Sequence, residues 1–369
     1  MKPWFRSGLF SILGVLAMSP FSRADDTVTF LDPAVGKEDK VTGAIQAESA
    51  AGITIKPGLG APRDIPANQI LDVEYQVPIE VKLDLHSAMT SEKVADTDPV
   101  PDNRQKALDA ALGKYTALQG QITDDKVKRY VAFKIAKITA REALAKPAQL
   151  TTAIDQLAAF KKNNPDSWEI TACDNLLADL QMLKGDWNGA LATYQDLEKT
   201  PNLSRDTVQT CELKIAQVLV KAQKFDEAQK KIESLMGSLK ADDPQKTRLQ
   251  ISLDACLAAK GQADQAVKDL QTIISTASDN DLKAMAYNGL GDSYRFAKQW
   301  EDARWAYLWV DVIYHQNREE HAKALYYLYK VSKEMKDDTR ANQFLDVLEQ
   351  DKDLAGTEYQ RLGAAEKLG

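Results

Sequence analysis

Six alanine residues recur from residue 153 onward at intervals of 37 or 38 residues, and this regularity constrains the fold more than any other feature. Four residues after each alanine comes Leu, Tyr or Ile, and seven residues after it comes Phe, Leu, Ile or Val. Positions i, i+4 and i+7 share one face of an α-helix, so the chain carries the same apolar stripe six times. The repeated alanines are Ala153, Ala190, Ala228, Ala266, Ala303 and Ala341.

Polar and proline-containing turn signals separate these stripes at residues 163–166, 200–202, 241–244 and 278–281. Each is followed by a second apolar helical run, and the residue pairs 185–186, 261–262 and 298–299 fall where the first helix of a unit must end. Such a helix pair buries its apolar side only against the next pair. We therefore predict a mainly α chain in which residues 105–365 form an α-solenoid of about six helix-turn-helix units.

Residues 287–310 carry the clearest copy of the unit, with Leu290, Gly291, Tyr294, Trp300, Ala303, Tyr307 and Val310 in register. This pattern resembles the tetratricopeptide repeat (TPR), and the resemblance covers roughly residues 125–350. Gly291 and the six repeated alanines are then the packing positions at which two antiparallel helices approach closely. The period exceeds the 34 residues of the family by three or four, so HEAT-type repeats of about 40–47 residues are the alternative fold.

The TPR resemblance implies a binding surface, because the first helices of that family line a concave groove that holds an extended peptide or a partner helix. Mapped onto the fifth and sixth units, this groove contains Asn288, Asp292, Arg295, Lys323, Tyr326 and Lys330. The three cationic side chains among them suit a carboxylate or an acidic segment, through charge-assisted hydrogen bonds.

The first 24 residues have the composition of a secretory signal peptide. Lys2 and Arg6 precede an apolar run over residues 8–18, and small residues follow, which predicts cleavage after Ala24. An uncleaved anchor is the alternative, although the run is shorter than the roughly 20 residues of a spanning helix. We expect a bacterial periplasmic or secreted protein.

Residues 25–86 differ from the rest, because short segments with two-residue alternation are broken by Gly and Pro. This predicts a small all-β module of about five strands, the last being residues 78–85. The tight turn at residues 65–67 before a final strand resembles small SH3-like or Sm-like barrels. Residues 87–104 lack periodicity and contain two prolines, which predicts a linker between the module and the solenoid.

The charge balance and the motif content restrict the function classes. Cleavage after Ala24 leaves 44 basic and 54 acidic residues, a formal net charge of −10, and no basic run offsets it, so nucleic-acid binding is disfavoured. The three cysteines form no CxxC motif, and we predict that Cys173 and Cys211 are free thiols. His315 and His321 are not spaced as a metal pair, and no catalytic motif is present.

We therefore expect a non-enzymatic protein that needs no metal and no small-molecule cofactor. The leading hypothesis is an exported scaffold that binds a protein or peptide partner in the groove. One alternative is a permanent structural component of a cell-envelope assembly, in which the β-module or the pair Trp305 and Trp309 docks. A third hypothesis is an unrecognised hydrolase or a glycan-binding enzyme.

Overall fold

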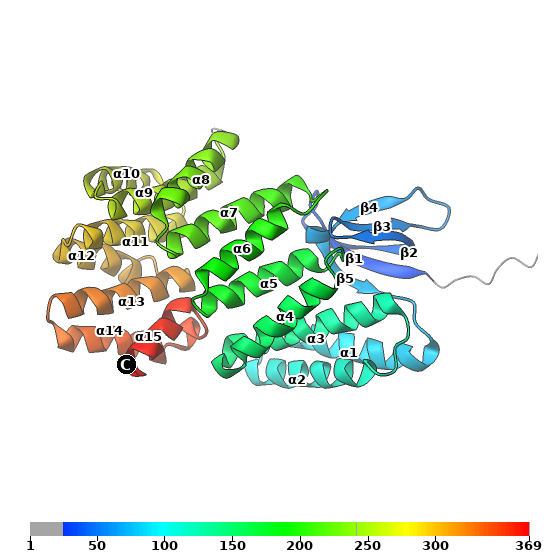
Figure 1. The fold of residues 1–369 in the computed structure, drawn as a ribbon. Coiled ribbons are helices and arrows are strands. Elements are labelled where there is room, and N and C mark those ends of the chain that lie inside the picture. The colour runs from blue at the N-terminus through cyan, green and yellow to red at the C-terminus, as the bar shows by residue number, and fades with distance from the viewer. Residues whose placement is uncertain (1–24, 241, 369) are drawn as a thin grey trace, which may run out of the picture.

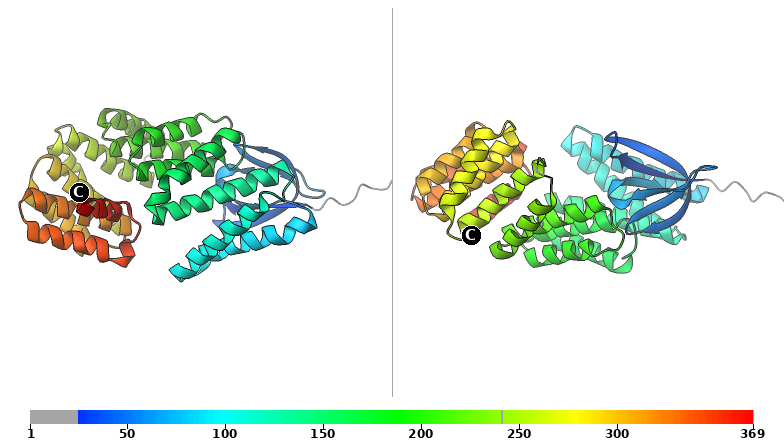
Figure 2. Two further views of the ribbon diagram at one scale, coloured as in Figure 1. Left: turned by 60° about the horizontal axis from the view of Figure 1, so that its bottom comes forward. Right: turned by 90° about the horizontal axis from the view of Figure 1, so that it is seen from above.

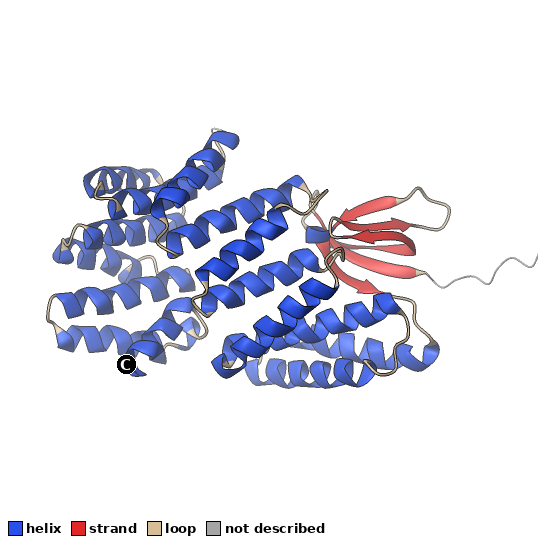
Figure 3. Ribbon diagram, viewed as in Figure 1, coloured by secondary structure: helices blue, strands red, loops and turns tan. Residues whose placement is uncertain are grey.

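A small antiparallel sheet forms one end of the molecule, and helices form the rest (Figure 3). The computed structural model describes residues 25–240 and 242–368, so the predicted signal peptide lies outside the described residues. The sheet has the order β4-β3-β2-β1-β5. Its strands are β1 (Asp26–Asp32), β2 (Lys37–Ser49), β3 (Gly52–Lys56), β4 (Arg63–Pro66) and β5 (Ile70–Glu74), and a 3-10 turn (Ala67–Gln69) precedes β5. A small five-stranded all-β module is confirmed, but the turn before its last strand lies at residues 67–69 instead of 65–67.

The predicted strand at residues 78–85 and the predicted linker at residues 87–104 are wrong. Both belong to a helical hairpin of α1 (Ile79–Thr97) and α2 (Pro101–Leu118). Val81, Leu85 and Ala88 are buried at helical spacing, whereas Leu83, which suggested alternation, is 73% exposed. Two of the buried α1 residues, Ala88 and Ala95, are small, so the helical period is faint in the sequence. The final strand of the sheet is β5 instead.

Two buried ionic clusters fix the sheet to the helices. Lys134, on α3 (Asp125–Ala145), places its Nζ 2.8 Å from Glu92 Oε2 of α1 and 3.1 Å from Asp72 Oδ1 of β5. Arg129, five residues earlier on the same helix, places its guanidinium 2.5 Å from Glu48 of β2 and 3.1 Å from Glu169. One hydrophobic cluster also runs from the sheet through α1, α2 and α3. The sheet and the first helices are therefore one body.

The solenoid continues from α3 as six antiparallel helix pairs in chain order (Figures 1 and 2). The pairs are α3 with α4 (Leu150–Asn163), α5 (Ile170–Leu183) with α6 (Trp187–Glu198), α7 (Arg205–Lys221) with α8 (Phe225–Ser238), α9 (Pro244–Ala259) with α10 (Ala263–Thr276), α11 (Asn280–Phe296) with α12 (Trp300–Val312), and α13 (Arg318–Glu334) with α14 (Asp338–Gln350). A 3-10 turn (Lys352–Leu354) leads to α15 (Glu358–Leu368). No helix within residues 25–240 and 242–368 is both long and apolar enough to span a membrane.

The six predicted alanines confirm the repeat. Each lies on the second helix of its pair, and each is fully buried. The residues four positions later are buried in all six pairs: Leu157, Tyr194, Ile232, Leu270, Tyr307 and Leu345. Each first helix from α5 to α13 ends through a left-handed residue at the same place in its unit, namely Gly185, Gln223, Gly261, Lys298 and Lys336.

Cysteines occupy matching buried positions on neighbouring first helices. Cys173 on α5 and Cys211 on α7 are free, as predicted, and Cys256 on α9 is free as well. Burial raises the pKa of Cys173 to about 12 and the pKa of Cys211 to about 11, so both stay protonated at neutral pH. These thiols act as small packing groups.

Gly291 shows how tightly the helices of the fifth unit pack. A Cβ atom added there would lie 2.6 Å from ring carbons of Tyr307, closer than real contacts allow. We expect Gly291→Ala to lower the free energy of unfolding by about 1–3 kcal/mol, through overpacking. The control is Gly113→Ala on α2, where a Cβ would meet nothing within 4 Å. That change should raise stability by about 0.5–1 kcal/mol, and chemical denaturation of both variants checks the opposite signs.

Candidate functional site

The predicted groove residues lie on α11 and α13, the first helices of the fifth and sixth units. Both helices begin at side-chain caps, because Asp279 accepts a hydrogen bond from a backbone N–H of α11 and Asn317 accepts two from α13. The caps fix where each helix starts and therefore which residues face one another. Within α11, Asn288, Asp292 and Arg295 are spaced by four and three residues, so they share one face.

Asp292 is the centre of an ionic cluster that joins α11, α12 and α13. Its Oδ2 lies 2.8 Å from Lys323 Nζ, and its Oδ1 accepts a hydrogen bond of 2.7 Å from the Tyr307 hydroxyl. Arg295 Nη2 lies 3.4 Å from the same Oδ1. Burial alone would raise the pKa of Asp292, but the charges of Lys323 and Arg295 outweigh it and hold this pKa below its usual range. The carboxylate is therefore ionised and paired inside the protein.

Asn288 is fully buried and also serves an internal contact. Its Nδ2 donates to the backbone oxygen of Glu320 at 2.9 Å and to the Glu320 carboxylate at 2.6 Å. With Asp292 and Lys323, it ties α11 to α13. These three predicted residues thus hold the two helices together.

Arg295, Tyr326 and Lys330 retain accessible surface, although each has internal contacts. The Arg295 guanidinium lies over the rings of Tyr327 and Phe296, 4.7 Å from each ring centroid. The Lys330 side chain is 44% exposed, and its Nζ lies 3.0 Å from Glu366 Oε1. The Tyr326 hydroxyl donates to the same oxygen at 2.9 Å. The structure therefore brings the six predicted residues together on two adjacent helices, with α15 beside them.

The residues of α15 were missed by sequence reasoning. Glu366 accepts hydrogen bonds from Tyr326 and Lys330, and the Tyr359 ring lies 5.7 Å from that of Tyr326 and 5.9 Å from that of Tyr327, centroid to centroid. The segment after residue 350 lies outside the six-fold register, so the repeat could not place it. The only available signal was a Tyr and a Glu seven residues apart, on one helix face.

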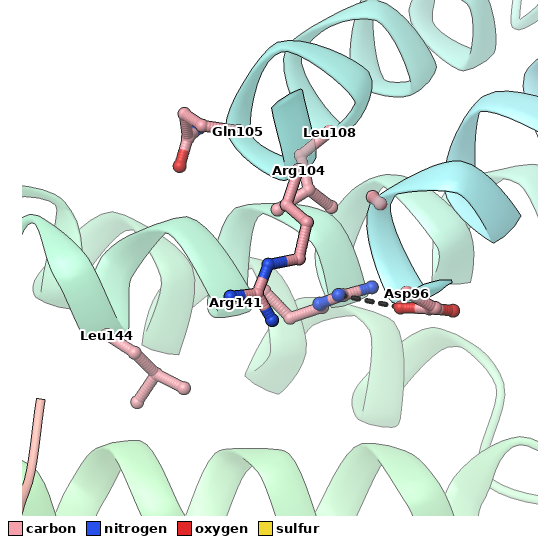
Figure 4. A pocket seen from close by; sticks show the side chains of 7 residues that line it. Asp96, Arg104, Gln105, Leu108, Arg141 and Leu144 are labelled. Carbon is pink, nitrogen blue, oxygen red and sulfur yellow. Dashed lines mark ion pairs between the residues drawn. The ribbon is translucent and has the colours of Figure 1, made fainter. Parts of the chain in front are cut away.

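A shallow pocket of about 340 Å³ lies elsewhere, between α1, α2 and α3 (Figure 4). Arg141 Nη2 is 2.7 Å from Asp96 Oδ1, and the exposed side chain of Arg104 points into the same space. Leu108 and Leu144 add an apolar wall. The pocket combines one internally paired cation with one solvent-facing cation.

His315 and His321, considered above as metal ligands, lie near each other, with ring centroids 5.7 Å apart. His321 Nε2 is 2.8 Å from Asp311 Oδ1. In the part of the chain that the structure describes, no three His, Cys, Asp or Glu side chains are grouped to hold a metal ion.

Trp305 and Trp309 lie on α12 and are 62% and 46% exposed. Trp309 stacks on Tyr287 at 5.5 Å, so one face of this pair is packed.

Solved structures share this fold at low sequence identity. A tetratricopeptide repeat protein from Parabacteroides merdae aligns over 76% of this chain and 99% of its own, with a TM-score of 0.54 and 14% identity. The apo form of RapI aligns over 78% of this chain and 100% of its own, with a TM-score of 0.51 and 11% identity. No protein-family model matches the sequence. No curated protein sequence matches it either. The helical region is therefore a TPR-like solenoid.

Proposed function

We propose that this protein is an exported, non-enzymatic scaffold that binds a protein or peptide partner on the face carried by the first helices α5, α7, α9, α11 and α13. We call this surface the first-helix face. This proposal is supported mainly by the six-fold stripe. It buries one face of each second helix, so that the pairs stack and the first helices form a continuous row. On α13, Tyr326 and Lys330 offer a hydroxyl and an ammonium group to an acidic segment.

The rigid attachment of the sheet supports a scaffold that acts as one body. The clusters around Arg129 and Lys134 join strands β2 and β5 to helices α1 and α3. A partner held by the solenoid would thus be positioned relative to whatever contacts the sheet. This differs from the flexible tether that the sequence suggested.

The chemistry of the buried charges favours binding over catalysis. Asp292, Glu92 and Glu169 each have a cationic partner within hydrogen-bond distance, and each is enclosed by side chains. The thiols are buried, and their pKa values are raised, which suits packing better than nucleophilic attack. We therefore assign no catalytic role to these groups.

Charge reversal on the first-helix face tests the proposal. In affinity capture from a bacterial envelope extract, Lys221→Glu with Lys330→Glu is expected to lower partner recovery at least tenfold. Arg295 is left unchanged, because it packs on Tyr327 beside the buried Asp292, and a Glu there would disturb the fold.

The matched control is Lys230→Glu with Lys268→Glu, which reverses two exposed charges on the second helices α8 and α10. It should leave recovery unchanged, and circular dichroism should show equal helix content in all proteins. Equal recovery by both double variants would count against the first-helix face.

A second function, a permanent place in a cell-envelope assembly, is favoured by one observation. Trp305, Trp309, Val312 and Ile313 expose large apolar side chains on and just after α12. Such a patch suits lasting association better than exchange of a partner. A monodisperse monomer by size exclusion with light scattering would favour the scaffold.

Export is proposed on the sequence of residues 1–24. The basic residues, the apolar run and the small residues before the expected cleavage site form the pattern of a secretory signal. N-terminal sequencing of the mature protein from the periplasmic fraction is expected to begin at Asp25.

A further inference from the structure

The C-terminal helix α15 packs beside the surface on which the proposed function places the partner. It contacts both α13 and α14, and Gly363 allows the close approach to α14, since a Cβ there would lie 3.0 Å from methyl carbons of Leu345 and Leu348. Towards α13, it contacts Tyr326 and Lys330, the two accessible groove residues of that helix. This part of the first-helix face therefore already has an occupant from the same chain.

The contacts of α15 have the chemistry that the groove was predicted to select. Glu366 is the hub, because its carboxylate accepts hydrogen bonds from Tyr326 at 2.9 Å, Lys330 at 3.0 Å and Tyr329 at 3.4 Å. Burial would raise the pKa of Glu366, but the Lys330 and Tyr326 hydrogen bonds outweigh it and lower this pKa. Tyr359, two helical turns before Glu366, places its ring against Tyr326 and Tyr327.

An ion pair also connects α15 to the third unit. Glu358, at the start of α15, pairs with Lys221, at the end of α7. Residues 221 and 358 are far apart in sequence, so α15 bridges first helices that belong to the third and sixth units. Two carboxylates of α15 thus meet two lysines of the first-helix face.

The strength of this docking is modest. The four side chains of the two ion pairs are between 29% and 44% exposed, and partly exposed pairs contribute about 0–1 kcal/mol each. A helix of 11 residues does not persist alone in water, so α15 stays helical because it is docked. Its attachment rests on the packing of Tyr359 and Gly363 and on Gln360, whose Nε2 donates to the backbone oxygens of Leu348 and Glu349 at 3.1 and 3.2 Å. A competing helix has to replace these contacts.

We propose that α15 is a built-in, displaceable ligand of the first-helix face, and that the exchanging partner is an amphipathic helix with an aromatic residue and a carboxylate two turns apart. This inference rests on the proposed function, since it names the kind of partner for the same site. The partner reproduces Tyr359 and Glu366 on one face, binds Tyr326 and Lys330, and releases α15 as it binds.

The test uses the full chain and a synthetic fluorescent peptide of residues 356–369 as the probe. In the double variant Tyr359→Ala with Glu366→Gln, the tethered α15 loses its ring contact and its charge, so the peptide is expected to bind at least tenfold more tightly than to the wild type. Adding Lys330→Glu to the double variant should weaken its binding of the peptide at least tenfold. The control is Leu362→Ala, which shortens an exposed side chain of α15 and should leave peptide binding at the wild-type level.

Two outcomes overturn the inference. The first is equal peptide binding by the wild type and the double variant. The second is hydrogen exchange of α15 in the wild type as slow as that of α13, which would make α15 a fixed end cap. Because the peptide is taken from this chain, the result does not depend on finding the natural partner. Peptide binding without partner capture from envelope extract would instead support the displaceable docking of α15 and count against the proposed function.

Discussion

Replacing Lys134 by Met is expected to lower the free energy of unfolding by about 3–5 kcal/mol, because it removes the buried cation that pairs with both Glu92 and Asp72. Lys134 is 4% exposed, and its ammonium lies between Glu92 on α1 and Asp72 on β5. The Tyr130 hydroxyl also donates to Asp72, at 2.6 Å, so the cluster spans sheet and helices. Urea denaturation followed by circular dichroism measures the loss.

The matched control is Lys137→Met, on the same helix. Lys137 Nζ lies 2.9 Å from Glu92 Oε1, but its side chain is 30% exposed, so we expect a loss of at most about 1 kcal/mol. Similar losses from the two variants would show that Lys134 does not hold the sheet in place. A loss below 1 kcal/mol for Lys134→Met would contradict the prediction outright.

The same cluster makes the free energy of unfolding depend on pH in the acidic range. Burial alone would raise the pKa of Glu92, but Lys134 and Lys137 outweigh it and lower this pKa to about 2. The carboxylate therefore contributes stability above its ordinary pKa near 4.5, and this contribution is lost as the pH falls towards 2. The stability difference between the wild type and Glu92→Gln should accordingly shrink from pH 6 to pH 2.

The repeat was predictable because it is written in local spacing. Ala303 and Tyr307 lie four residues apart on one helix, and the same pair of positions recurs in every unit. A sixfold repeated stripe leaves the chain few ways to bury its apolar surface other than stacking helix pairs. The register, the turn positions and the buried alanines followed from this feature alone.

The attachment of the sheet was not predictable, because it depends on pairs distant in sequence. Lys134 and Asp72 are 62 residues apart, so no local pattern connects them. The helix α1 was missed for a related reason, since its contact with α2 uses the small residues Ala88 and Ala95. Small side chains carry little of the hydrophobic periodicity on which helix prediction relies.

The candidate site was predicted as a set of positions, but its internal contacts were not. The resemblance placed Asp292 and Lys323 on adjacent first helices, and the structure joins them at 2.8 Å. Their mutual pairing follows from the spacing of α11 and α13 in three dimensions. The contact of Glu366 with Lys330 depends on a helix outside the repeat, so no periodic pattern could reveal it.

Asp254→Ala is expected to stabilise the protein by up to about 4 kcal/mol at pH 8. Asp254 lies on α9 twelve residues before Ala266, the position that Gly291 occupies before Ala303. This position of the unit requires a small side chain, because two helices approach closely there. In the fourth unit it holds the fully buried carboxyl group of Asp254. Gln250 donates to its Oδ1 at 2.8 Å, and its Oδ2 has no hydrogen-bond partner among the described residues.

The sign of the pH dependence follows from this burial. Burial raises the pKa of Asp254 to about 7, the Gln250 hydrogen bond lowers it somewhat, and Asp269 raises it further. In the unfolded chain this carboxyl titrates near 4, so the wild type loses stability as the pH rises from 4 to 7 and loses no more above that. A shift of about three pH units corresponds to about 4 kcal/mol. The gain from Asp254→Ala should therefore grow over the same interval.

The measurement is urea denaturation of the wild type, Asp254→Ala and Asp254→Asn at pH 4, 5.5, 7 and 8. Asp254→Asn keeps the shape without the charge, so it should share the growing advantage over the wild type. The control Asp264→Asn removes a carboxylate from an exposed position on α10 and should follow the wild-type curve within about 0.5 kcal/mol. A gain from Asp254→Ala that is the same at pH 4 and pH 8 would mean that this carboxyl has the same pKa in the folded protein as in the unfolded chain, and would contradict the prediction.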